Sequence, residues 1–187
     1  MPPESSGGSA KSVARRRVFF ALWPDADIAG QLDQLGRQAH ALCGGRRMRR
    51  DSLHMTLAFI GDVPVERIET LRHAAAQVSG SAFELSLDRL ACWRHNRIVW
   101  AGCEQAPLPL LTLVGQLTER LAEAGLSLDT RDFAAHVTLL RDARGEELPE
   151  CESFIWPVGE FVLAAALPEG GGHYEIIDRW PLAPPAA

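Results

Sequence analysis

Several residue types and patterns are scarce in this sequence of 187 residues. Lysine occurs once, at Lys11, against 18 arginines, and tyrosine occurs once, at Tyr174. No apolar run approaches the roughly 18 residues that a membrane-spanning helix needs. The opening residues, MPPESSGGSAKS, contain no apolar stretch typical of a secretory signal. We therefore expect a cytoplasmic protein that makes no use of a membrane.

The cysteine content argues against a disulfide framework and against a metal site. Four cysteines are scattered along the chain without any C-x-x-C spacing, whereas disulfide frameworks belong to small secreted chains. His40 and Cys43 are three residues apart, but no second pair of ligands accompanies them. A histidine on a helix surface and a buried free cysteine are the favoured interpretation. We expect no metal and no other cofactor.

The charge balance excludes one class of function and leaves another open. There are 24 acidic and 19 basic residues, so the net charge is −5, which disfavours non-specific binding of nucleic acid through bulk charge. A small site for one phosphate remains compatible with this total. Basic residues cluster at 15–17 and at 46–50. The second cluster could guide an RNA backbone or could equally be a solvated loop.

Hydrophobic periodicity predicts interleaved strands and helices. Strands are expected at 18–23, 53–60, 83–87, 97–100, 133–140, 160–167 and 173–180, and helices at 24–42, 64–78 and 110–121. A Gly-Gly-Gly sequence at 170–172 predicts a hairpin between the last two strands. The fold class is therefore α+β with largely antiparallel sheets. Residues 1–14 should be a disordered tail, and 15–187 a single domain.

The most informative feature is a short internal repeat. Leu53-His54-Met55-Thr56-Leu57 recurs 82 residues later as Ala135-His136-Val137-Thr138-Leu139, each time within a predicted strand. Side chains two apart on a strand point to the same face. Each histidine and its threonine can therefore face a cleft.

The residues between the polar ones should then face the core. These are Met55, Leu57 and Phe59 in the first strand, and Val137 and Leu139 in the second. Histidine can serve as acid or base near neutral pH, and threonine can donate a hydrogen bond to a phosphate oxygen. A single His-x-Thr is more often structural, but duplication in matching strands favours catalysis. The other four histidines (His40, His73, His95 and His173) are interpreted as surface or structural residues.

This arrangement resembles the two-histidine phosphoesterases, and specifically the bacterial RNA 2′,3′-cyclic phosphodiesterases, also known as the 2′,5′-RNA ligase family. The resemblance extends from about residue 17 to 182, through the segments 17–22, 53–62, 93–100, 131–133, 136–141, 172–174 and 180–182. It implies two pseudo-symmetric lobes whose antiparallel sheets line a central cleft, with helices outside. Ala135 and Ala166 depart from the family, which usually has proline and serine there.

The resemblance also implies an activity and a set of site residues. The expected reaction opens a 2′,3′-cyclic phosphate at an RNA end without a metal and yields a 2′-phosphomonoester. His54 would be the proton donor and His136 the proton acceptor, while Thr56, Thr138 and Arg141 would bind the phosphate. Strict alternation puts Arg141 on the face opposite His136, so this side chain would have to reach around the strand end. Base stacking is expected from Phe19 or Phe20, with a core position for the other ring.

Three interpretations remain open. The chain could hydrolyse cyclic phosphate ends, it could also join RNA reversibly through 2′–5′ linkages, or it could be a non-catalytic module that binds RNA ends or nucleotides. The intact histidines in both motifs favour an enzyme. The expected partner is RNA or an oligonucleotide with a 2′,3′-cyclic phosphate end, and the expected state is a monomer.

Overall fold

The computed structural model describes residues 14–128, 132–145, 147–168 and 170–184. The predicted disordered tail therefore lies almost wholly outside the described residues. None of the helices within these ranges is long and apolar enough to cross a membrane. The helices are α1 (Ala26–Cys43), α2 (Ile68–Ala76) and α3 (Leu108–Glu123), with short 3₁₀ turns η1 (Arg50–Ser52) and η2 (Val65–Arg67).

Within the described ranges, ten strands make up the rest of the regular structure. They are β1 (Arg15–Leu22), β2 (Arg46–Arg47), β3 (Met55–Pro64), β4 (Phe83–Leu87), β5 (Arg89–Trp93), β6 (Ile98–Gly102), β7 (His136–Arg141), β8 (Phe154–Val158), β9 (Glu160–Ala166) and β10 (Tyr174–Pro181). The α+β class predicted from the sequence is confirmed. The boundaries of β4 agree with the prediction, whereas β2, β5 and β8 were not predicted.

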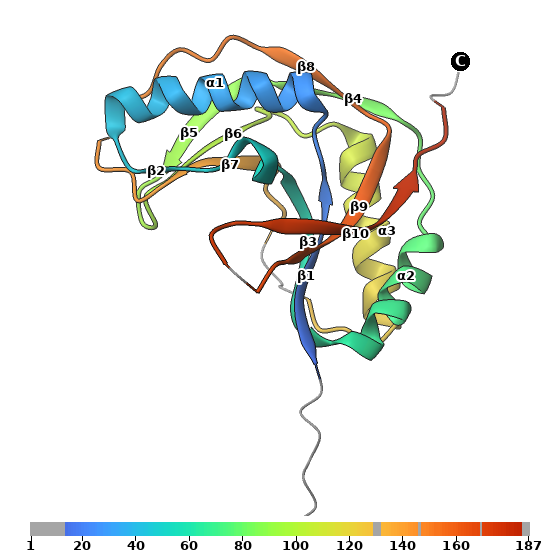
Figure 1. Ribbon diagram of the computed structural model, residues 1–187. Helices are drawn as coiled ribbons and strands as arrows, with labels where there is room; N and C mark the ends of the chain where they lie inside the picture. The colour runs from blue at the N-terminus through green and yellow to red at the C-terminus, as the bar shows by residue number, and fades with distance from the viewer. Residues whose placement is uncertain (1–13, 129–131, 146, 169, 185–187) are drawn as a thin grey trace, which may run out of the picture.

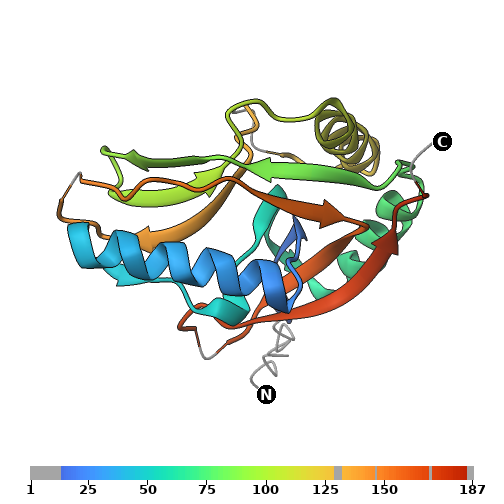
Figure 2. The same cartoon turned by 90° about the horizontal axis from the view of Figure 1, so that it is seen from above.

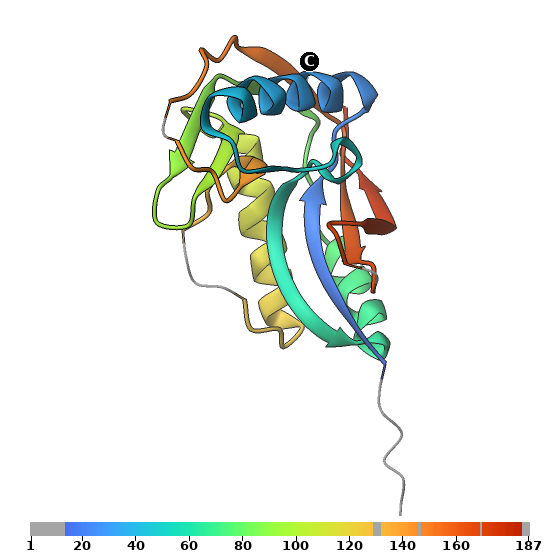
Figure 3. The same cartoon turned by 60° about the vertical axis from the view of Figure 1, so that its left-hand side comes forward.

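One large antiparallel sheet forms the framework, in the order β10-β9-β1-β3-β7-β6-β5, with β2 added beside β7. A second, two-stranded sheet pairs β4 with β8 (Figure 2). Strands β1 and β3 lie side by side along eight residue pairs (Figure 3). By contrast, a single pair, Met55 with Val137, joins β3 to β7. The large sheet therefore consists of two halves that meet at one narrow seam.

The helices are divided between the two halves. Helix α1 packs against β7, whereas α3 packs against β3 and α2 packs against α3 and β10 (Figure 1). The first helix begins two residues later than predicted, at Ala26, because the Asp25 carboxylate accepts hydrogen bonds from the backbone N–H groups of Asp27 and Ile28 and so caps it. Gly44, at φ +64°, ends it in a conformation that few residues other than glycine adopt.

Most apolar side chains collect on the helix-facing side of the sheet. Val18, Phe20 and Leu22 of β1 belong to this main core and are fully buried. The alternate residues Phe19 and Ala21 belong instead to a small apolar cluster on the other face, together with residues of β9. Helices thus occupy one face of the sheet, which leaves the other face of β1, β3 and β7 available for a site.

Candidate active site

A cavity of about 340 Å³ lies where the two halves of the sheet meet. This volume is within the range of small-molecule sites. The walls include both predicted motifs and the arginine that follows the second one, together with unpredicted residues. The lining consists of Arg17, Phe19, Met48, Ser52, His54, Thr56, Phe59, His136, Thr138, Arg141, Ala166, Leu167, Gly170, Gly172, His173 and Tyr174.

The seam between β3 and β7 brings the two His-x-Thr motifs together. Its antiparallel pair, Met55 with Val137, is the central residue of each motif. The motifs therefore run in opposite directions, so the first residue of each lies toward the last residue of the other. Both central side chains are fully buried in the core. The histidines and threonines accordingly face the cavity, as the alternation predicts.

Each motif is followed by a β-bulge at the equivalent position. Leu57 is the extra residue opposite Phe20 and Ala21, and Leu139 is the extra residue opposite Val99 and Trp100. A bulge interrupts the alternation of side chains. It returns the residue five positions after each histidine to the cavity face.

The bulges explain the positions of Arg141 and Phe59. Arg141 lines the cavity because the bulge reverses the alternation, so it does not have to reach around the strand end. Phe59, predicted to face the core, is half exposed and lines the cavity as well. That prediction is wrong because strict alternation was carried through the bulge. Phe59 is thus the pseudo-symmetric counterpart of Arg141.

Both histidines are oriented by backbone carbonyls. The Nδ1 atom of His54 lies 2.7 Å from the carbonyl oxygen of Ser52, and that of His136 lies 2.8 Å from the carbonyl oxygen of Ala134. A carbonyl only accepts hydrogen bonds, so Nδ1 carries the proton in each ring. The Nε2 atom is therefore the nitrogen left to exchange a proton with a ligand.

Burial disfavours the protonated form of both rings. Burial lowers the pKa of His54 from 6.5 to about 4. The hydrogen bond to the Ser52 carbonyl raises this pKa in part, whereas the charges of His136 and Arg141 lower it further. Burial also lowers the pKa of His136, and Arg141 adds to the effect. The guanidinium of Arg141 thus acts electrostatically on both histidines.

Aromatic rings enclose each histidine. The His54 ring stacks on Phe19, with centroids 4.7 Å apart, and on Trp23 at 5.2 Å, while the Tyr174 ring meets it edge-on at 5.2 Å. The His136 ring is met edge-on by Trp93 at 4.5 Å. These contacts remove water from the rings, which is the physical origin of the lowered pKa values.

The two predicted stacking residues have different locations. Phe19 lines the cavity, although it is only 4% exposed and its ring is already in contact with His54. Phe20 is fully buried in the main core against Phe161 and Trp180. Phe20 therefore cannot contact a ligand in the cavity, because neighbouring residues on a strand point to opposite faces.

Several lining residues were not predicted from the sequence. The Arg17 guanidinium lies 5.8 Å from the centre of the Phe59 ring and 3.3 Å from the Asp62 carboxylate, so it is held at the cavity wall. His173, interpreted from the sequence as a surface or structural residue, also lines the cavity, next to Tyr174. A signal was present in the glycines at 170–172, since such a hairpin can approach a site closely.

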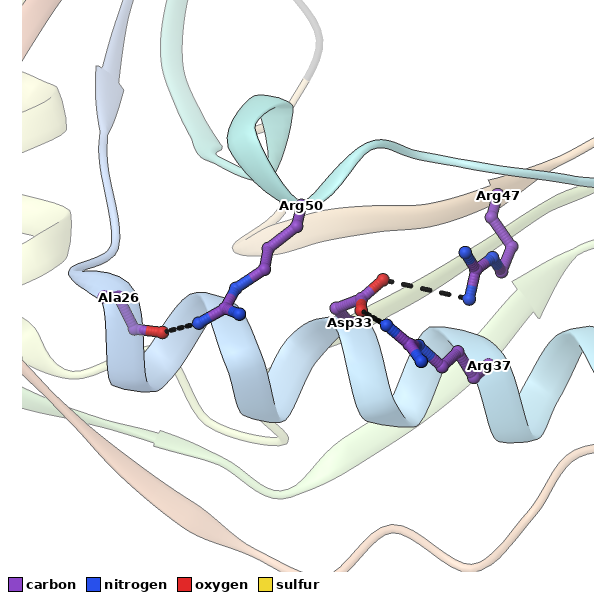
Figure 4. Close-up of polar contacts among 5 residues, drawn as sticks. All are labelled: Ala26, Asp33, Arg37, Arg47 and Arg50. Atoms are coloured by element: carbon purple, nitrogen blue, oxygen red, sulfur yellow. Dashed lines mark hydrogen bonds and ion pairs between the residues drawn. The ribbon is translucent and has the colours of Figure 1, made fainter.

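The basic cluster at 46–50 is largely occupied by contacts within the chain. Arg50 donates a hydrogen bond to the carbonyl oxygen of Ala26, while Arg47 lies 3.9 Å from Asp33, which Arg37 also binds at 2.7 Å (Figure 4). These contacts attach the segment before the first motif to helix α1. A role for this cluster in guiding RNA stays a prediction.

Among the described residues, no group of three or more His, Cys, Asp or Glu side chains is placed to hold a metal ion. Metal independence is not tested by this finding and stays a prediction. The cysteines in the described ranges are free.

Comparison with known proteins agrees with this geometry. Residues 22–100 match the family model described as LigT like Phosphoesterase. The chain is 34% identical over 170 residues to the RNA 2′,3′-cyclic phosphodiesterase of Escherichia coli, a match that covers 89% of this chain and 97% of the relative. The chain belongs to the LigT-like phosphoesterase family. Its predicted resemblance and its assignment as a hydrolase are thereby confirmed.

Solved structures of LigT-like proteins share the fold. The crystal structure of E. coli LigT complexed with 3′-AMP superposes with a TM-score of 0.83 at 33% sequence identity, covering 90% of this chain and 99% of that one. A protein of Thermus thermophilus, TT0787, superposes with a TM-score of 0.75 at 21% identity and so supports the fold alone. The LigT-like fold therefore extends over nearly the whole chain.

Proposed function

We propose that this LigT-like protein hydrolyses a terminal 2′,3′-cyclic phosphate of RNA to a 2′-phosphomonoester by metal-independent acid–base catalysis. The observation that carries the proposal is the seam of β3 and β7, which places two carbonyl-oriented histidines on one cavity beside Arg141. The E. coli relative is named for this activity.

Each histidine has a separate role in the proposed reaction. Nε2 of His136 accepts a proton from the attacking water as the new P–O bond forms. Nε2 of His54 donates a proton to the 3′ oxygen of the ribose as its bond to phosphorus breaks. Each such group accelerates a reaction by about 10²- to 10⁴-fold. Thr56, Thr138 and Arg141 bind the non-bridging oxygens, where negative charge develops in the transition state.

The protonation states set a condition on this mechanism. Burial lowers the pKa of both histidines, that of His54 to about 4, so the protonated form of each ring is disfavoured before substrate binds. A cyclic phosphate carries one negative charge, and an opposite charge within a few ångströms raises the pKa of a histidine. The donor must therefore take up a proton as the substrate binds. The rate should accordingly fall at alkaline pH, when that proton is no longer available.

The direct test uses a short RNA ending in a 2′,3′-cyclic phosphate, incubated with the protein in EDTA. The wild type should release only the 2′-phosphate isomer, and His54→Ala and His136→Ala should each lose at least about 100-fold in rate. His73→Ala, an exposed histidine of α2, is the matched control and should retain full activity. Binding without turnover by the wild type would instead support a non-catalytic RNA-end binding module.

A second test assigns the two roles. A 3′-thio substrate has a leaving group that needs little protonation, so losing the proton donor should matter less. His54→Ala should therefore recover much of its rate on this substrate, whereas His136→Ala should not. Recovery by His136→Ala alone would reverse the assignment while leaving the paired-histidine mechanism intact.

A further inference from the structure

A groove of about 760 Å³ adjoins the cavity that contains both histidines, called here the histidine cavity. Their described linings have four residues in common, namely Arg17, Ala166, Leu167 and Gly170. The rest of the described lining of the groove comes from β1, β3 and the segment around the β9–β10 hairpin, and consists of Arg15, Arg16, Asp62, Pro168 and Glu175. Because three consecutive arginines of β1 line it, we call it the arginine groove.

The described lining of the arginine groove is positively charged, with three guanidinium groups against two carboxylates. Arg16 forms an ion pair with Glu175, and the Arg17 guanidinium lies 3.3 Å from the Asp62 carboxylate. Arg15 is exposed and donates a hydrogen bond of 2.6 Å to the backbone carbonyl oxygen of Asp62. This acceptor is neutral and does not cancel the charge of Arg15, so the guanidinium can still attract an anion.

The alternation of β1 places Arg15 and Arg17 in line with Phe19. The extra residues at both register shifts between β1 and β3 belong to β3, so the alternation of β1 is unbroken. Residues two apart on a strand share a face and are separated by roughly 6.6 Å. Phe19 contacts the His54 ring at the inner end of this row. A single nucleic-acid strand that leaves the histidine cavity along β1 would therefore meet Arg17 first and Arg15 next.

We infer that the arginine groove binds the phosphodiester backbone of the RNA upstream of the cyclic phosphate. The inference rests on the proposed function, in which His54 protonates the departing 3′ oxygen and His136 accepts the proton of the attacking water. Attack on phosphorus occurs in line with the leaving oxygen. The terminal ribose and the chain attached to it therefore lie on the His54 side. The arginine groove adjoins the histidine cavity on this side, where β1 carries both Phe19 and Arg17.

Another arginine-lined cavity, of about 660 Å³, lies between α1 and the basic cluster at 46–50. Within the described linings it has Met48 alone in common with the histidine cavity. In this cavity Arg49 lies 2.7 Å from Asp51 and Arg37 lies 2.7 Å from Asp33. The arginine groove has the more extensive connection to the histidine cavity, so we assign the RNA strand to the arginine groove.

The test compares a mononucleotide, a dinucleotide and a trinucleotide that all end in a 2′,3′-cyclic phosphate and differ in the number of internal phosphodiesters. The ratio kcat/KM for hydrolysis is measured for the wild type, for Arg15→Gln and for Arg15→Lys, which keeps the positive charge. Arg120→Gln, at an arginine of α3 that lines neither the groove nor the histidine cavity, is the matched control. Arg49→Gln tests the cavity beside α1 as the competing path.

We expect kcat/KM of the wild type to rise about tenfold or more from the mononucleotide to the trinucleotide, since hydrogen bonds to charged groups are strong. Arg15→Gln should lose about fivefold or more on the trinucleotide, mainly through KM, but less than twofold on the mononucleotide. Arg15→Lys should recover much of this loss, and Arg120→Gln should match the wild type. The slope of log KM for the trinucleotide against log salt concentration should become shallower by about 0.7 in Arg15→Gln, as the loss of one phosphate contact to a single strand predicts.

A trinucleotide whose internal linkages are methylphosphonates lacks the charges that Arg15 would bind. Arg15→Gln should cost less than twofold on this substrate, and a loss as large as that on the natural trinucleotide would overturn the inference. Equal activity of the wild type on all three lengths, or an equal loss in Arg15→Gln on all three, would overturn it as well. A length-dependent loss in Arg49→Gln but not in Arg15→Gln would place the RNA beside α1 instead. Failure of the wild type to hydrolyse any of these substrates would overturn the proposed function itself.

Discussion

Acidification from pH 7 to pH 4 should destabilise the protein through His54. Its pKa is about 4 in the folded protein, against an ordinary value of 6.5, because burial disfavours the charged ring. Between these two values the unfolded chain binds a proton that the folded chain does not. The free energy of unfolding therefore falls as the pH is lowered through this window, and the loss is complete below pH 4.

The size of the effect follows from the shift. A pKa difference of one unit corresponds to about 1.4 kcal/mol, so the lowering of the His54 pKa amounts to roughly 3 kcal/mol by pH 4. This is a large share of the 5–15 kcal/mol that is typical of a folded domain. His136 adds a contribution of the same sign, since burial lowers its pKa too.

Urea unfolding at pH 7, 6, 5 and 4 and constant ionic strength measures the effect. His54→Gln removes the titrating group. Between pH 7 and pH 4 its free energy of unfolding should therefore fall by roughly 3 kcal/mol less than that of the wild type. His73→Gln, at an exposed position of α2, should keep the wild-type slope. Identical slopes for the wild type and His54→Gln would refute the argument that burial holds this ring neutral.

Three further predictions concern the framework of the site. Asp25→Ala removes the acceptor for two backbone N–H groups at the start of α1 and should cost about 1 kcal/mol in urea unfolding. Gly102→Ala would place a Cβ 2.2 Å from the carbonyl oxygen of Ala135, so it should displace the strand leading into His136 and lower cyclic phosphate turnover. Gly115→Ala, with open space around its position, should leave turnover unchanged. The Cys103 thiol, whose pKa burial raises to about 11, should resist alkylation by iodoacetamide at pH 8 until urea unfolds the chain.

Local sequence patterns were sufficient for much of the fold. The helix that follows Asp25 and the alternating strand 83–87 could be predicted because helix starts and period-two burial depend on neighbouring residues. Strands β2 and β8 were missed, since their pairing partners β7 and β4 are distant in the sequence. Strand β5 pairs with its neighbour β6, but it was missed because its burial does not alternate along the strand. Pairing of this kind stabilises a strand that its own residues indicate only weakly.

The same division applies to the site. A repeated His-x-Thr in two strands was enough to select His54, Thr56, His136 and Thr138, because side chains two apart on a strand must share a face. Arg17 and His173 carry no comparable local pattern. They reach the cavity through β1 and through the hairpin before β10, which the tertiary fold brings beside β3.

The sequence by itself determined the repeat and therefore which four side chains share the two cavity-facing strands. Only the tertiary structure decided that Phe59 and Arg141 join them, because a bulge is defined by the register between two strands and not by either strand alone. It also decided the low pKa of His54, since desolvation depends on the rings of Phe19, Trp23 and Tyr174. Phe19 and Trp23 lie in and next to β1 and Tyr174 lies in β10, so they meet His54 only when the sheet has formed.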